Sequence, residues 1–110
     1  MITTHVLDTA TGRPGKGIAI ELEREHRGVW NLIGGGITDD DGRLRTLTSA
    51  GSLPVATYRI RFQTGLYFAT QGVTGFFPVV EIQFSVTDEH AHYHVPLLLS
   101  PYSYSTYRGS

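Results

Sequence analysis

Hydrophobic and polar residues alternate in three separate segments of the chain, residues 18–25, 57–63 and 79–87. In each segment the even positions carry the apolar side chains: Ile18, Ile20 and Leu22, then Tyr58, Ile60 and Phe62, then Val80, Ile82, Phe84 and Val86. A period of two is typical of a β-strand that buries one face and exposes the other. The pattern therefore predicts three strands, each with one side in a hydrophobic core.

Four further segments favour strands with a weaker alternation: residues 3–7, 29–33, 93–99 and 102–107. Only residues 66–73 have room for a helix, of about two turns. Turn-forming residues separate the predicted elements, at Gly12–Gly17 with Pro14, Gly34–Gly36, Asp41-Gly42 and Gly51–Pro54. The glycine run at 34–36 is interpreted as a flexible or bulged strand end. Seven or eight short strands with frequent turns predict a sandwich of two β-sheets.

Length and charge narrow the class of protein. The chain has 110 residues, too few for two independent cores, so we expect one domain that spans residues 1–110. Nine Lys and Arg residues face ten Asp and Glu residues, a net charge of −1. This balance gives no general attraction to nucleic acid or to anionic membranes, and we expect neither as a partner.

Other classes are excluded by what the chain lacks. It contains no Cys, which excludes disulfides, a thiol nucleophile and a thiolate metal site. No apolar run approaches the roughly 20 residues that a membrane-spanning helix needs. The N-terminal residues have neither the basic nor the apolar part of a signal peptide, so the expected location is the cytoplasm.

Histidine supplies the first candidate chemistry. His90, His92 and His94 alternate with other residues, so an extended segment 90–95 would point all three imidazoles to one face. Such a row could bind zinc, because His-x-His is a recurrent ligand spacing. The alternative is that only one or two of them face a site and the rest face solvent. No carboxylate lies within the row to complete a ligand set. His26 lies in a predicted turn and is interpreted as a surface residue.

His5 and Arg43 can each be interpreted either as an ordinary structural or surface residue or as a residue of a functional site. His5 lies in an apolar segment, where a histidine is more often a core residue than a catalytic one. Arg43 follows Asp41-Gly42, where an arginine usually reaches solvent.

The Gly34–Gly36 run lacks the Lys-Ser/Thr of a phosphate loop, and there is no Gly-x-Ser-x-Gly elbow. From the residues alone, His and Arg are candidate site residues without an assigned reaction.

The C-terminal segment keeps the pattern of a strand almost to its end. Tyr102, Tyr104 and Tyr107 alternate with Ser and Thr before Arg108-Gly109-Ser110. Chain ends are usually polar and frayed. The pattern therefore indicates an end that is tied into the fold or into an interface.

These segments together resemble the transthyretin-like 5-hydroxyisourate hydrolases over almost the whole chain. The resemblance rests on Thr3–Thr9 with Gly12–Pro14, Asp41–Arg43, Phe76–Pro78, His92–Pro101 and Tyr104–Ser110. The most specific part is the ending Tyr107-Arg108-Gly109-Ser110, which separates the enzymes from transthyretin proper, a carrier of thyroid hormone. The middle strands match only loosely.

The resemblance implies an all-β, prealbumin-type sandwich of two four-stranded sheets with one short helix. It also implies a homotetramer, a dimer of dimers, with active sites between the dimers. The reaction would be hydrolysis of 5-hydroxyisourate to 2-oxo-4-hydroxy-4-carboxy-5-ureidoimidazoline in urate degradation, a part of purine metabolism.

Carried over by motif, the implied catalytic residues are His5, Arg43, His94 and Ser110. The implied substrate-binding residues are His5, Arg43, Tyr107, Arg108 and Gly109. No metal and no other cofactor is implied, because acid–base and electrostatic help suffice to hydrolyse a strained cyclic amide.

The residue types suit that chemistry. An imidazole can take a proton from water near neutral pH, and a planar guanidinium matches the paired acceptors of a purine-like substrate. His5 and His94 are expected to share the proton transfers, with Arg43 binding and polarising the carbonyl. Which histidine is the base stays open, as does the choice between the hydroxyl and the α-carboxylate of Ser110. His92 is a weaker candidate that either supports the site or faces solvent.

Two alternatives from other classes remain at this point. One is a non-enzymatic, transthyretin-like carrier of a small hydrophobic ligand in the channel between dimers. The other is a zinc-binding sandwich that uses the histidine row, or a row that binds zinc adventitiously.

Overall fold

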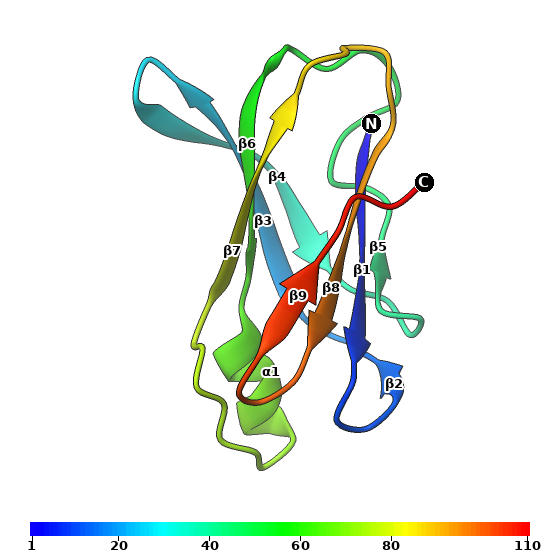
Figure 1. Cartoon of the computed structure of the whole chain (residues 1–110), viewed down its shortest axis with the longest axis vertical. Coiled ribbons are helices and arrows are strands. Elements are labelled where there is room, and N and C mark those ends of the chain that lie inside the picture. The colour runs from blue at the N-terminus through cyan, green and yellow to red at the C-terminus, as the bar shows by residue number, and fades with distance from the viewer.

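Two β-sheets face each other in the computed structural model, which describes residues 1–110 (Figure 1). The elements in chain order are β1 (Ile2–Asp8), β2 (Arg13–Pro14), β3 (Ala19–His26), β4 (Val29–Ile37), β5 (Arg43–Leu44), β6 (Ala56–Phe62), α1 (Thr64–Thr70), β7 (Val80–Val86), β8 (Tyr93–Leu99) and β9 (Tyr104–Thr106). The predicted all-β sandwich with one short helix is confirmed.

The sheets differ by one strand from the expected pair of four-stranded sheets. One sheet has the order β4-β3-β6-β7, and all its neighbours are antiparallel. The other has the order β2-β1-β8-β9, with β5 also paired to β1. The extra strand arises because β5 pairs with residues 4 and 5 of β1, whereas β2 pairs with residues 7 and 8. The two short strands thus lie end to end along one edge.

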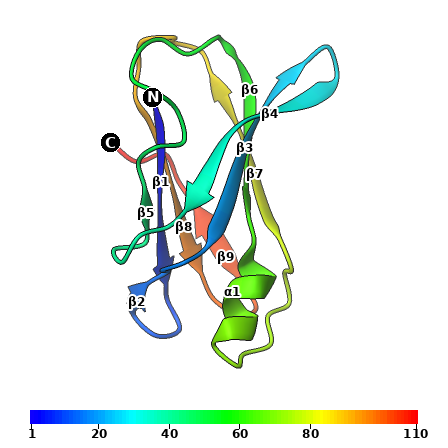
Figure 2. The same ribbon diagram turned by 180° about the vertical axis from the view of Figure 1, so that it is seen from behind.

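The pairing of β1 with β8 determines where the chain ends lie. These strands are parallel and in register from Ile2 opposite Tyr93 to Asp8 opposite Leu99. The N-terminal strand therefore lies beside a strand near the C-terminus. The N-terminus and the C-terminus lie close together in both views (Figures 1 and 2). Helix α1 lies at the opposite end of the sandwich.

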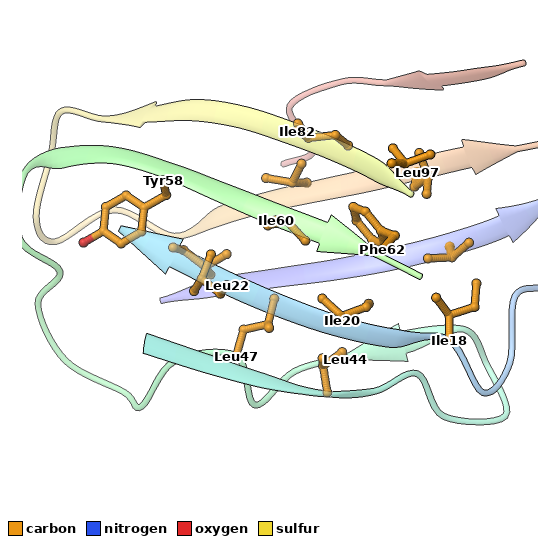
Figure 3. Close-up of a cluster of buried hydrophobic side chains, with 14 of the residues drawn as sticks. Ile18, Ile20, Leu22, Leu44, Leu47, Tyr58, Ile60, Phe62, Ile82 and Leu97 are labelled. Carbon is orange, nitrogen blue, oxygen red and sulfur yellow. The ribbon is translucent and has the colours of Figure 1, made fainter. Parts of the chain in front are cut away.

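The core fills the space between the sheets with twenty buried hydrophobic residues (Figure 3). All three alternating segments contribute their even positions, as the pattern predicts: Ile18, Ile20 and Leu22, Tyr58, Ile60 and Phe62, and Val80, Ile82 and Val86 are buried. Phe84 is only partly buried and packs against this core. Burying these side chains stabilises both sheets in one register, because a slip by one residue would expose them.

Three features of the structure correct the sequence-based expectations or add to them. The Gly34–Gly36 run lies inside β4 rather than at a strand end, next to a bulge where the register with β3 shifts. A Cβ at Gly34 would collide with the carbonyl oxygen of Leu47, so glycine at this position lets the backbone at Leu47 pass close to β4.

The helix begins and ends earlier than predicted, at Thr64 and Thr70. No helix is long and apolar enough to cross a membrane.

Candidate active site

The outer face of the five-stranded sheet collects the candidate residues. Successive side chains of β1 point to opposite faces, so Thr3 and His5 lie on the face opposite Thr4 and Val6. There Thr3 is still covered, at 7% exposed, and His5 is half-buried. The register sets Thr3 opposite His94 on β8. It also sets His5 opposite Arg43 on β5. Three strands thus bring His5, Arg43 and His94 to one side of the sheet.

A hollow of about 300 Å³ opens on this face near the two chain ends. Its lining includes Thr3, Arg43, Arg45, His92, His94 and Ser110. A larger hollow of about 530 Å³ lies by the β3–β4 hairpin, but it contains none of the candidate residues. The smaller hollow is therefore the better candidate site, because it joins two imidazoles, two guanidinium groups and the C-terminal residue.

His94 is the half-buried histidine of the hollow. Its Nδ1 atom lies 2.9 Å from Oγ1 of Thr3. Burial lowers the pKa of His94 below its ordinary value, and the positive charges of Arg43, His92 and His5 lower it further. The imidazole is thus neutral at neutral pH and can accept a proton.

His5 is held by the loop that precedes β5. Its Nε2 atom lies 2.9 Å from the carbonyl oxygen of Asp41. A carbonyl can only accept, so Nε2 carries the proton and the Nδ1 atom of neutral His5 has a free lone pair. The contact orients the ring and assigns its tautomer.

The Asp41-Gly42-Arg43 motif has a local structural reason. The carboxylate of Asp39 accepts hydrogen bonds from the backbone N–H groups of Asp41 at 2.9 Å and Arg43 at 3.0 Å. The bond from Arg43 is the main cause that lowers the pKa of Asp39. Gly42 has a φ of 75°, and a Cβ there would collide with the carbonyl oxygen of Val6. The turn thereby positions Arg43 in β5, which pairs with β1.

The C-terminal residues divide between two sides of the sheet. The N–H of Gly109 donates to the carbonyl oxygen of His94 at 2.8 Å, and Ser110 lines the hollow. The guanidinium of Arg108 instead lies 4.6 Å from the ring centroid of Tyr93. Tyr107 and Arg108 line a separate hollow of about 220 Å³ beside β7. Within this chain, the structure therefore brings Gly109 and Ser110 to His94, but not the side chains of Tyr107 and Arg108.

Of the two interpretations of the histidine row, the structure shows the one in which only part of the row faces a site: His92 and His94 line the hollow, and His90 does not. Strand β8 begins only at Tyr93, and His90 lies in the preceding turn. His90 is 76% exposed, with Nε2 3.3 Å from a carboxylate oxygen of Glu89. No group of three or more His, Cys, Asp or Glu side chains is arranged to hold a metal ion. The zinc interpretation of the row thus loses its geometric basis.

Thr3 is a residue of the site that the sequence interpretation missed. Its Oγ1 atom lies 2.8 Å from Nε2 of His92 as well as 2.9 Å from Nδ1 of His94. The available signal was its position, two residues before His5 on the same face of a predicted strand. His92, the weaker candidate, lies with it at the hollow.

Comparisons with known proteins identify a family and several similar chains. A family model described as "HIUase/Transthyretin family" matches residues 2–109. The chain is 46% identical to "5-hydroxyisourate hydrolase 2" of Rhizobium meliloti, over 99% of this chain and 95% of that protein. Klebsiella pneumoniae 5-hydroxyisourate hydrolase is similar in structure, with a TM-score of 0.86 and 36% identity over 99% of this chain and 98% of that one. Sea bream transthyretin in complex with thyroxine is also similar, with a TM-score of 0.92 and 34% identity over 98% and 93%.

Proposed function

The chain belongs to the HIUase/Transthyretin family, and we propose that it is an enzyme of urate degradation that hydrolyses 5-hydroxyisourate. The observation that supports this most is that Arg43 and His94 line one polar hollow, with His5 opposite Arg43 on the same sheet face. Relatives that carry the name of this hydrolase match nearly the full chain.

His94 is the proposed general base. Hydrolysis of a cyclic amide needs a water molecule that loses a proton as its oxygen attacks the carbonyl carbon. His94 suits this step because burial and nearby positive charge keep it neutral. A positioned base typically accelerates such a step by about 10²–10⁴-fold. His5, held through Nε2 by Asp41, presents Nδ1 as an acceptor for a substrate N–H or O–H group.

Arg43 is the proposed electrophilic group. Its guanidinium presents two parallel N–H donors, which match the adjacent acceptors of a purine-like ring. The same positive charge would stabilise the oxyanion that forms at the attacked carbonyl. Asp39 supports this role because its carboxylate fixes the backbone of Arg43.

The terminal residues are proposed to form one wall of the site. Gly109 and Ser110 are the proposed neighbours of substrate and water, through the backbone of Gly109 and through the hydroxyl or the carboxylate of Ser110. Tyr107 and Arg108 would support substrate binding indirectly, because Arg108 anchors the segment on the ring of Tyr93.

A homotetramer, a dimer of dimers, is the proposed assembly. The outer face with His5 and His94 is open in the single chain, so a facing dimer would close the site from water. Strands β7 and β9 end their sheets with unpaired edges, along which a second copy could extend both sheets. Similar chains include transthyretins as well as hydrolases.

The alternative is a carrier of a small hydrophobic ligand. The overall fold does not separate the two functions, because the chain is similar both to a hydrolase and to a transthyretin in complex with thyroxine. The site favours hydrolysis, since a carrier of an apolar ligand has no use for a neutral imidazole beside a guanidinium.

The direct test adds purified protein to freshly generated 5-hydroxyisourate and follows the decay of its ultraviolet absorbance against the spontaneous rate. The expected result is an acceleration proportional to protein concentration that persists in a chelator. No acceleration by a folded protein would contradict the proposal and favour the carrier, for which ligand binding would then be measured.

A further inference from the structure

The geometry points to a proton relay in which Thr3 connects His94 to His92 and sets which nitrogen of His94 is free to act as the base. The inference rests on the proposed hydrolysis and extends it to two positioning residues behind the base. Oγ1 of Thr3 lies 2.8 Å from Nε2 of His92 and 2.9 Å from Nδ1 of His94, so one hydroxyl bridges two imidazoles.

The bridge restricts the protonation of both rings because a hydroxyl has a single hydrogen. If Thr3 donates to His92, then Nδ1 of His94 must donate to Thr3, and Nε2 of His94 is unprotonated. If Thr3 donates to His94, then Nε2 of His92 must donate to Thr3, and Nε2 of His94 carries the proton. The first arrangement makes His94 a base, and the second makes it an acid.

When the hydrogen bonds change from the first arrangement to the second, the charge of the proton that the attacking water loses is passed to His92. As the water oxygen bonds to the carbonyl carbon, one water proton moves to Nε2 of His94. The proton on Nδ1 of His94 moves to Oγ1 of Thr3, and the original hydroxyl proton of Thr3 moves to Nε2 of His92. His94 is neutral again, His92 carries a positive charge, and the substrate carries the oxyanion.

Breakage of the carbon–nitrogen bond reverses these transfers. The oxyanion re-forms a carbonyl, and the leaving nitrogen takes the proton from Nε2 of His94. His92 returns its proton to Thr3, and Thr3 returns one to Nδ1 of His94. The protein is restored, and one imidazole serves first as base and then as acid, as hydrolysis requires.

The surroundings of the three residues suit this direction of transfer. His94 is half-buried and has the guanidinium of Arg43 near it, so a charge there is unfavourable. His92 is exposed, and water can stabilise the charge that it would receive. The relay thus moves the charge from a half-buried imidazole to an exposed one.

Protonation states provide a test that does not depend on activity. Two-dimensional NMR of the ¹⁵N-labelled full chain reports which nitrogen of each imidazole carries the proton. At neutral pH we expect the Nδ1–H form for His94, a loss of that preference in Thr3→Val, and its return in Thr3→Ser. The Nε2–H form for His94 in the unaltered protein would overturn the relay, even if the protein hydrolyses 5-hydroxyisourate.

Kinetics provide the second test. We expect Thr3→Val to lower kcat by about 10- to 100-fold, part of what a general base contributes, with KM nearly unchanged and recovery in Thr3→Ser. His92→Gln should lower kcat similarly, because an amide can hydrogen bond to Thr3 but cannot take up its proton. Full activity of His92→Gln would overturn the relay.

Matched controls exist for both variants. Thr9→Val removes a hydroxyl that bonds the carbonyl of Leu99 just beyond the other end of β1, and His90→Gln removes an exposed histidine two residues from His92. Both should keep the full rate. If circular dichroism shows that Thr3→Val does not fold, the rate of the exposed variant His92→Gln still tests the relay. If the unaltered protein does not hydrolyse 5-hydroxyisourate, the proposed function is rejected. The NMR result would still show whether Thr3 links His92 and His94 by hydrogen bonds in the expected direction.

Discussion

Gly109 lies against the imidazole of His94. A Cβ built at Gly109 would be 2.5 Å from Cδ2 of His94, closer than carbon atoms approach in folded proteins. The N–H of Gly109 also donates to the carbonyl oxygen of His94 at 2.8 Å. The backbone of the C-terminal segment thus holds the ring from one side, while Thr3 holds Nδ1.

The first prediction concerns this contact. Gly109→Ala should lower kcat/KM for 5-hydroxyisourate by about 10²-fold, because the added methyl must displace the ring or the segment and a shift of about 1 Å can cost that much. The global fold should stay intact, since Gly109 lies outside the core. Ser105→Ala, on exposed β9, is the control and should keep its rate. If Gly109→Ala is as active as the control, the position of His94 does not depend on this contact.

The second prediction concerns the shape of the Arg43 side chain. Arg43→Lys should lower kcat/KM by about 10²–10³-fold although the charge is retained, because an ammonium group cannot provide the paired donors of a guanidinium. Arg13→Lys, an exposed change on β2 of the same sheet, is the control. Turnover near that of the control would remove Arg43 from the mechanism.

The third prediction concerns the charge of Arg43. Arg43→Met should raise the pKa of His94, because it removes a positive neighbour that disfavours the imidazolium. The imidazole should then become protonated at higher pH than in the unaltered protein, as read from its NMR titration. Arg13→Met should leave the titration where it was. A downward movement in Arg43→Met would mean that the two groups do not interact as the structure indicates.

The fourth prediction concerns a buried hydrogen bond that fastens the helix to the first strand. The hydroxyl of Tyr67 on α1 donates to Oδ2 of Asp8 at 2.8 Å, and Asp8 is 3% exposed. Tyr67→Phe should lower the free energy of unfolding by about 1–3 kcal/mol, the typical cost of a buried acceptor left without its donor. Urea unfolding measures the loss, with the exposed Tyr102→Phe as control.

The same pair makes the loss depend on pH. Burial and the Asp8 carboxylate raise the pKa of Tyr67 to about 12, from an ordinary value of 10. A raised pKa means that the folded protein holds the proton more tightly, so the contribution is complete below pH 10 and is lost as pH rises toward 12. The difference between the unaltered protein and Tyr67→Phe should therefore be smaller at pH 11 than at pH 8. A constant difference would show that the phenol proton is not involved.

Local patterns were sufficient for most of the fold. Alternation at Ile18–Leu22 or at Tyr58–Phe62 reports which face of a strand is apolar, and burial of that face decides the register. The short strands β2 and β5 have two residues each, too few to show a period. They exist as strands because β1 offers an unpaired edge on one side.

The order of residues was enough to predict the sandwich, the strand-like chain end and, through a resemblance of motifs, a set of candidate residues. How those residues meet depends on the pairing of strands. His5, Arg43 and His94 are far apart in the chain, and they come together because β1 pairs with both β5 and β8. A local pattern fixes the face on which a side chain lies, whereas its neighbours across strands depend on which edges pair. The same pairing placed Thr3 between two histidines, while His90 stayed in a turn outside the sheet.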